Sequence, residues 1–205
     1  MKKIMRFALC LLLAAALLAG CSPASGKKVQ RGEWDGNLYQ NTFAGFNFRM
    51  PEGWLASSDE EIARMMEQSV EMLEDDGAYQ KAVESMETVY DAMMADPNIG
   101  NNVIVMYQNV GLMGMLGAEL DEYVEETVKQ LEESDQFAYT FVETTDQKLG
   151  DKDYRCAQMS VDISGITATQ YYLMAKESGY VVAVIFSVFD GTPLSDMLAL
   201  FEPAQ

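Results

Sequence analysis

The pattern of apolar and polar positions divides the chain into an apolar leader, a short polar stretch and a longer body with helical and strand periods. Residues 7–20 carry no charged side chain, and they follow a basic head formed by Lys2, Lys3 and Arg6. A helix needs about 20 apolar residues to cross a bilayer, so this run is too short to span one. Its layout is that of a signal peptide. Residues 22–30 are rich in small and polar side chains and predict a flexible tether.

The first part of the body, residues 34–54, has the strand period and predicts a β-hairpin with its turn at Ala44 and Gly45. Apolar side chains alternate there with Asn47 and Arg49. We therefore expect the second strand to have one buried face and one solvated face.

Helical spacing follows the hairpin. A serine at position 57 or 58 caps a predicted helix, and Gly77 is expected to end it. Residues 79–95 also fit a helical period, whereas 89–107 fit two strands around a turn. We expect a short helix to about residue 87 and a strand over 88–95. Residues 103–107 are apolar throughout, as in a central strand.

The second half of the body begins with the clearest amphipathic pattern of the chain, a predicted helix over 120–131. The strands that we expect after it are 138–147, 152–163, 166–175 and 179–188, with turns at Gly150, Gly165 and Gly179. A closing helix is expected to have Thr192 as its cap and Pro193 as its first residue. The pattern contains no internal repeat. It predicts a single α+β domain over 34–205, an antiparallel β-sheet flanked by helices.

Acidic residues dominate the composition, with a formal net charge of −18 and no histidine. Without residues 1–20 the chain has 11 basic and 32 acidic residues. Nucleic-acid binding needs a basic surface, so nucleic acid is not expected as a partner. The lack of histidine excludes Ser-His-Asp and Cys-His catalysis and His-ligated zinc. We therefore assign no catalytic residue, no metal ligand and no enzymatic activity.

Three cysteines occur in the chain, and only Cys156 lies in the expected domain. Cys10 belongs to the leader and Cys21 follows it directly, so we expect no internal disulfide bond. The stretch "LAGC" at 18–21 resembles the lipobox of bacterial lipoproteins. The resemblance implies cleavage between Gly20 and Cys21. It also implies that the Cys21 thiol carries a covalent diacylglyceryl group and becomes the lipidated N-terminus of the mature chain.

The lipobox sets the expected domain organisation and location. Residues 1–20 are the lipoprotein signal peptide, and residues 21–33 are the lipidated N-terminus and tether. The lipid anchor places the protein on the outer face of the bacterial cell membrane, or on an outer membrane if the cell has two, which Ser22 would permit. The basic residues Lys27, Lys28 and Arg31 either touch lipid head groups or are simply solvated. No other cofactor is expected.

A second resemblance concerns the whole body. The hairpin ending in "FRMPEGW" (48–54), followed by a helix, a further hairpin, a helix, four strands and a last helix, resembles the PsbP-like α+β fold. That fold also occurs in small bacterial lipoproteins of unassigned role. The resemblance implies a sandwich in which helices cover both faces of an antiparallel sheet. It also implies a binding or assembly accessory rather than a catalyst, and it transfers no functional residue.

One candidate site is the stretch "GLMGMLG" at 111–117. Its apolar residues form either a loop that docks a partner or a cap over the core. These residues are Leu112, Met113, Met115 and Leu116.

Several weaker candidates have an ordinary structural alternative. Acidic runs at 59–61, 71–76 and 119–126 either hold Ca²⁺ or Mg²⁺ or lie on solvated helix faces. Trp34 and Trp54 either stack on a sugar or pack at the edge of the first hairpin. Cys156 faces away from its apolar neighbours and is expected to be half-covered, with a redox thiol as the alternative.

The function expected from these patterns is that of a membrane-anchored extracytoplasmic lipoprotein with a non-enzymatic binding or accessory role. Its partner is a protein or a small ligand of unknown identity. Two alternatives remain open at the level of sequence. A pair of carboxylates could hydrolyse cell-wall or environmental glycans. The acidic surface could instead make the domain a divalent-cation-binding module.

Overall fold

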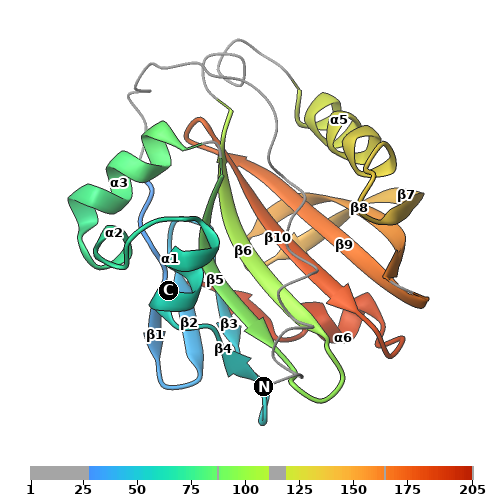
Figure 1. The fold of residues 1–205 in the computed structure, drawn as a ribbon, viewed down its shortest axis with the longest axis horizontal. Helices are drawn as coiled ribbons and strands as arrows, with labels where there is room; N and C mark the ends of the chain where they lie inside the picture. Colours follow the sequence, from blue (N-terminus) through green and yellow to red (C-terminus); the bar gives the residue numbers. More distant parts are fainter. Residues whose placement is uncertain (1–27, 87, 111–118, 164, 205) are drawn as a thin grey trace.

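The computed structural model describes residues 28–86, 88–110, 119–163 and 165–204. The strands within these ranges form two antiparallel sheets (Figure 1). The larger sheet has the order β4 (Leu55–Ala56), β5 (Thr88–Ala95), β6 (Asn102–Asn109), β10 (Tyr180–Val188), β9 (Ile166–Glu177), β8 (Lys152–Ile163) and β7 (Ala138–Leu149). The smaller sheet has the order β1 (Glu33–Asp35), β2 (Leu38–Asn41), β3 (Phe46–Arg49) and β11 (Phe201–Pro203).

The helices lie at opposite ends of the molecule. In Figure 1, α1 (Asp59–Met65), α2 (Glu71–Glu74) and α3 (Asp76–Ser85) lie at one end of the longest axis, and α5 (Leu120–Glu132) lies with β7 at the other. A short helix, α6 (Leu194–Leu198), precedes β11. None of the helices in the described ranges is long and apolar enough to cross a bilayer.

Both faces of the larger sheet are covered. One face packs against the smaller sheet and α1–α3, and the core there includes Tyr39, Phe46 and Val105. The opposite face packs against α5 through Val124 and Leu131. Alternate residues of β6 and β10 therefore enter different cores, which explains why both strands are apolar almost throughout. The predicted fold class, an α+β antiparallel sheet flanked by helices, is confirmed.

Most predicted elements of the second half are present. The four long strands, the amphipathic helix α5 and the central strand β6 lie where the periodicity placed them. The short helix and the strand after it are also confirmed, as α3 and β5. Apolar spacing in these segments reflects direct packing on one of the two cores, so local pattern and tertiary structure agree.

The predicted helix from Ser58 to Gly77 is wrong in its extent. Ser58 caps α1 with the expected capping box to Glu61, but the chain turns at Glu67, whose φ is 57°. Asp75 then adopts an extended conformation and caps α3 by accepting a hydrogen bond from the Ala78 N–H at 2.7 Å. Gly77 consequently lies in the first turn of α3 and does not end a helix.

Two further local predictions are wrong. Asn47 is 4% exposed rather than solvated, because β3 is flanked by both β2 and β11, and its side-chain amide donates to the Pro203 carbonyl at 3.3 Å. Thr192 does not cap the last helix. Its N–H and hydroxyl donate to Asp190, and Pro193 is the capping residue.

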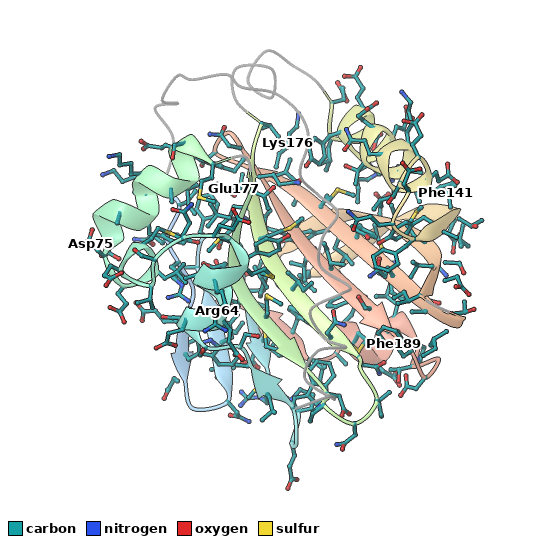
Figure 2. All side chains as sticks on the ribbon, in the orientation of Figure 1. Arg64, Asp75, Phe141, Lys176, Glu177 and Phe189 are labelled. Atoms are coloured by element: carbon teal, nitrogen blue, oxygen red, sulfur yellow. The ribbon has the colours of Figure 1, made fainter. Side chains whose placement is uncertain are left out.

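The long strand β7 forms one edge of the larger sheet. Most of its side chains are exposed, including Phe141 and Val142. A β-bulge between Phe141 and Glu143 interrupts its pairing with β8. Figure 2 shows Phe141 at the end of the molecule opposite Asp75.

The turn between β7 and β8 places Gly150 against the turn of the first hairpin. Gly150 has a φ of +60°, and a Cβ atom there would lie 2.3 Å from the Gly45 carbonyl oxygen. We expect Gly150→Ala to lower the free energy of unfolding by about 2–4 kcal/mol through backbone strain and this clash. Gly165→Ala is the matched control, because its φ is also positive but nothing lies within 4 Å. It should cost only about 1 kcal/mol in urea unfolding. Equal losses would show that the contact has no role.

Candidate functional site

The most buried charged side chain of the described residues is Asp91, which is 1% exposed. It lies on β5 at a β-bulge, where the pairing of β5 with β6 shifts between Tyr90 and Ala92. A bulge inserts one extra residue and changes the direction of the side chain there. Asp91 and Ala92 are consequently both buried, although neighbours in a regular strand point to opposite faces.

Five groups donate hydrogen bonds to the Asp91 carboxylate, and they come from four parts of the chain. Tyr79 on α3 donates to Oδ1 at 2.6 Å. The Gly32 N–H and the Asn41 amide donate to Oδ2 at 3.0 and 3.1 Å. The hydroxyl groups of Tyr39 and Tyr107 donate to the same oxygen. We call these residues the Asp91 cluster.

Asn41 orders the interior of the cluster. Its side-chain oxygen accepts a hydrogen bond from the Ala44 N–H at 2.7 Å, which fixes the amide plane at the hairpin turn. Its amide group then points at Asp91 and at the Tyr107 hydroxyl, 2.6 Å away. The first hairpin is thereby joined to β5 and β6 through buried polar contacts, which are strong when every member is satisfied.

Arg31 lies beside this cluster and forms a bidentate ion pair with Asp59 on α1. The Nη1–Oδ2 distance is 2.8 Å, and Nη1 also donates to the Leu73 carbonyl at 3.3 Å. The two predicted environments of Arg31, lipid head groups or free solvent, are both wrong. The sequence does not reveal the contact because Asp59 lies 28 residues away. Lys28 is exposed, and Lys27 lies outside the described residues.

The protonation of these groups follows from their burial. Burial raises the pKa of Asp91, and the hydrogen bonds from Tyr39 and Tyr79 only partly oppose it. Burial also raises the pKa values of Tyr39, Tyr79 and Tyr107, so these phenols are hydrogen-bond donors at neutral pH. The hydrogen bond from Arg31 lowers the pKa of Asp59, which keeps that carboxylate charged.

The Asp91 cluster is arranged to hold chain segments together. General acid–base catalysis requires a side chain within hydrogen-bond reach of a substrate. The Asp91 oxygens are instead occupied by groups of the chain itself, in the core. Together with the Arg31–Asp59 pair, the cluster ties residues 31–32 to α1, α3, β2, β5 and β6.

A second polar group lies between the two sheets. The Lys152 ammonium pairs with Glu177 and donates to the Phe43 carbonyl at 2.8 Å. The Tyr154 hydroxyl donates to the neighbouring Ala44 carbonyl at 3.1 Å. These contacts hold the hairpin turn against β8 and β9. The charged groups of Lys152 and Glu177 therefore also make contacts within the protein.

Cys156 is 1% exposed, so the prediction of a half-covered thiol is wrong. It does face away from Ala157 and Met159, as predicted, but the core between the two sheets covers that face as well. Burial raises the pKa of the Cys156 thiol to about 12.

Cys156 should therefore react slowly with iodoacetamide at pH 8, because both the thiolate and access to it are scarce. We expect the folded protein to react at least about 100-fold more slowly than the same protein in guanidinium chloride. Mass spectrometry of timed samples measures both rates. Equal rates would contradict the buried, protonated thiol and support the redox alternative.

The other surface candidates are held by separate partners. Trp34 packs against Tyr39 with the ring centres 5.3 Å apart, and Trp54 packs near Phe48 at 6.4 Å. In the acidic runs, Asp121 pairs with Arg155, which also pairs with Asp146. Within the described ranges, no three acidic or cysteine side chains converge as metal ligands.

The remaining predicted site residues lie outside the described residues. They are Gly20 and Cys21 of the lipobox, and Leu112, Met113, Met115 and Leu116 of the predicted partner loop. Of the expected tether, residues 21–27 also lie outside, whereas Val29, Arg31 and Gly32 contact the body.

Sequence reasoning missed the Asp91 cluster. A signal is present, because Asp91 is the single charged residue in the apolar stretch "VYDAMMA" at 89–95. A charge in such a strand is seldom buried without partners. The partners themselves are up to 59 residues away in sequence, and a bulge cannot be recognised from periodicity.

Comparison with solved structures finds matches of low sequence identity. The solution structure of cyanobacterial PsbP (CyanoP) from Synechocystis sp. PCC 6803 matches with a TM-score of 0.49 and 14% identity, over 90% of this chain and 98% of that chain. A crystal structure from Bacteroides thetaiotaomicron VPI-5482 matches with a TM-score of 0.42 and 13% identity, over 83% of this chain and 49% of that chain. No family model and no curated protein matches the sequence.

Proposed function

We propose that the chain is a lipid-anchored extracytoplasmic protein whose body binds a protein or small-ligand partner without catalysing a reaction. The observation that carries the proposal is the sequence "LAGC" at 18–21 after an uncharged apolar run and a basic head. This order of features is that of a lipoprotein leader, and the Cys21 thiol is the acceptor of the lipid.

The lipid is sufficient to hold the protein at the membrane. Each buried CH₂ group contributes about 0.8 kcal/mol, and two acyl chains give stable anchoring where one does not. The body therefore needs no contact with lipid. Its strong negative charge favours a position in water beside an anionic membrane rather than on it.

Side chains that could act in catalysis instead contact other parts of the same chain, and this supports an accessory role. Asp91 and Cys156 are buried in the core, and the partly exposed Lys152–Glu177 pair holds the hairpin turn against β8 and β9. Such groups stabilise a rigid body, and a rigid body presents its surface to a partner at low entropic cost.

Mass spectrometry of the mature chain tests the anchor. The expected polypeptide begins at Cys21 with a diacylglyceryl thioether. An intact leader or an unmodified Cys21 sulfur would contradict the anchor.

Crosslinking on intact cells tests the accessory role. We expect a discrete adduct with one protein. A chimera that carries residues 1–28 on an unrelated acidic domain is the matched control, because it shares the anchor and lacks the body. Identical adducts from the chimera and the full chain would contradict a protein-binding role for the body.

A further inference from the structure

The segment from Val29 to Gly32 is bound to the body at each inward-facing position, and we call it the docked segment. Val29 is 4% exposed and belongs to the core between the two sheets. Arg31 pairs with Asp59, and the Gly32 N–H donates to Asp91. Lys28 and Gln30 between them are exposed, so the segment lies extended on the surface with alternate side chains inward.

The fit at Gly32 is close. A Cβ atom at this position would lie 2.3–2.4 Å from the ring and hydroxyl of Tyr39, which is itself fully buried. Glycine is thus required there for the backbone to reach Asp91. The contacts combine an apolar anchor, a bidentate ion pair and a backbone hydrogen bond to a buried carboxylate, so the segment is part of the folded body.

Because the body begins at Val29, the chain that joins it to the anchor is short. Eight peptide steps separate Cys21 from Val29. A chain of that length spans at most about 26–29 Å. A compact domain of this size is roughly 40 Å across. The connection is consequently shorter than the body that it holds.

We infer that the docked segment orients the anchored protein, with the α1–α3 end toward the membrane and the β7 and α5 end away from it. This inference rests on the proposed lipid anchor at Cys21. The docked segment contacts α1 and α2 through Arg31, so the chain leaves the body at that end. Figure 1 places β7 and α5 at the opposite end of the longest axis.

Negative charge at the α1–α3 end keeps this end of the body at a distance from the lipid surface, and the short connection still holds it toward the membrane. The exposed residues of α1 and α2 are mainly acidic, and like charge repels an anionic surface over about one Debye length, near 10 Å. The short connection sets the greatest distance between the body and the membrane surface, and the repulsion sets the smallest. Partners that meet the β7 and α5 end therefore approach from the side away from the anchoring membrane.

Limited trypsin digestion of membranes that carry the full-length protein tests the docked segment. Early cleavage should occur after Lys27, which precedes the docked segment in the sequence, with cleavage after Arg31 at least about tenfold slower because Arg31 is paired. Asp59→Ala should bring the two rates together. Glu60→Ala, in the same exposed first turn but without contact to Arg31, should not. Equal cleavage at both sites in the unchanged protein would overturn the inference, whether or not the chain is anchored.

The orientation is measured by energy transfer from a dye on the body to acceptor lipids. Exposed Glu74 on α2 and Val142 on β7 are replaced by cysteine in separate variants and labelled, because Cys156 is buried. Transfer from position 74 should be at least about twofold more efficient than from 142, given the size of the body. Asp59→Ala or Gly32→Ala should reduce this difference. Equal transfer from both positions in membrane-bound protein would overturn the orientation alone, whereas protein that fails to sediment with membranes would overturn the anchor.

Discussion

Replacing Asp91 with alanine is expected to lower the free energy of unfolding by about 3–5 kcal/mol. The substitution leaves three tyrosine hydroxyls, the Asn41 amide and the Gly32 N–H without their common acceptor in the core. Each unsatisfied donor costs about 1–3 kcal/mol, and the costs are not additive because water enters the cavity. Urea unfolding followed by circular dichroism measures the loss.

Two matched variants separate the cluster from general effects. Asp153→Ala removes a carboxylate that is exposed and pairs only loosely with Lys148, so it should change stability by about 0.5 kcal/mol or less. Asp91→Asn keeps an acceptor oxygen, and its amide can donate to the Tyr79 hydroxyl. Its cost should be about 1–2 kcal/mol. A loss of 1 kcal/mol or less for Asp91→Ala would contradict the assigned role of the cluster.

Comparing the unchanged protein with Asp91→Asn at different pH values tests the direction of the Asp91 pKa shift. Burial raises the pKa of Asp91 in the folded state, so the folded protein binds a proton more readily than the unfolded chain. The stability of the unchanged protein relative to Asp91→Asn should increase as the pH falls from 7 toward the ordinary carboxyl pKa, near 4. Comparison with the variant cancels the effects of the other carboxylates, including Asp59. A relative stability that decreases over this range would mean that the Asp91 pKa is lowered.

Replacing Cys21 with alanine is expected to move the protein from the membrane fraction to the soluble fraction, or to leave it unprocessed. Without the thiol there is no acceptor for the diacylglyceryl group, and an acidic body has no other strong attraction to lipid. We expect at least about a 100-fold fall in the ratio of membrane-bound to free processed protein, given the affinity that two acyl chains confer. Sedimentation and immunoblotting measure this ratio.

The other two cysteines provide controls for this substitution. Cys10→Ala lies in the leader and should leave anchoring unchanged. Cys156→Ala lies in the core and should leave anchoring unchanged while lowering stability slightly. Membrane retention and normal processing of Cys21→Ala would contradict the lipid anchor, whereas release of all three variants would point to a general defect in folding or export.

The sequence predicts the parts of the fold in which each element packs directly on a core. Leu131 and its helical neighbours face one core, and the strand residues from 152 to 188 alternate between two, so their spacing is visible in the chain. Asn47 shows why other parts are not predictable. Its burial depends on β11, which is far along the chain and has only three residues. The break at Glu67 has no glycine or proline beside it to mark it in the sequence, although the φ of Glu67 is 57°.

The candidate site was less predictable than the fold. The Asp91 cluster depends on contacts between residues 12 to 59 positions apart, and on a bulge that reverses the expected alternation of β5. The ion pair of Arg31 is not predictable either, because Asp59 lies 28 residues further along the chain. By contrast, the lipobox is a contiguous motif, so the prediction of an anchor rests on the sequence alone.

The irregularity in β7 has a consequence for crowded membranes. Copies held by the proposed lipid anchor would diffuse in two dimensions and meet often, and a straight edge strand invites pairing between sheets of neighbouring copies. The bulge between Phe141 and Glu143 and the charges that follow on β7 interrupt the ladder that a second copy would need. A protein held at high surface density can thereby remain dispersed instead of polymerising edge to edge.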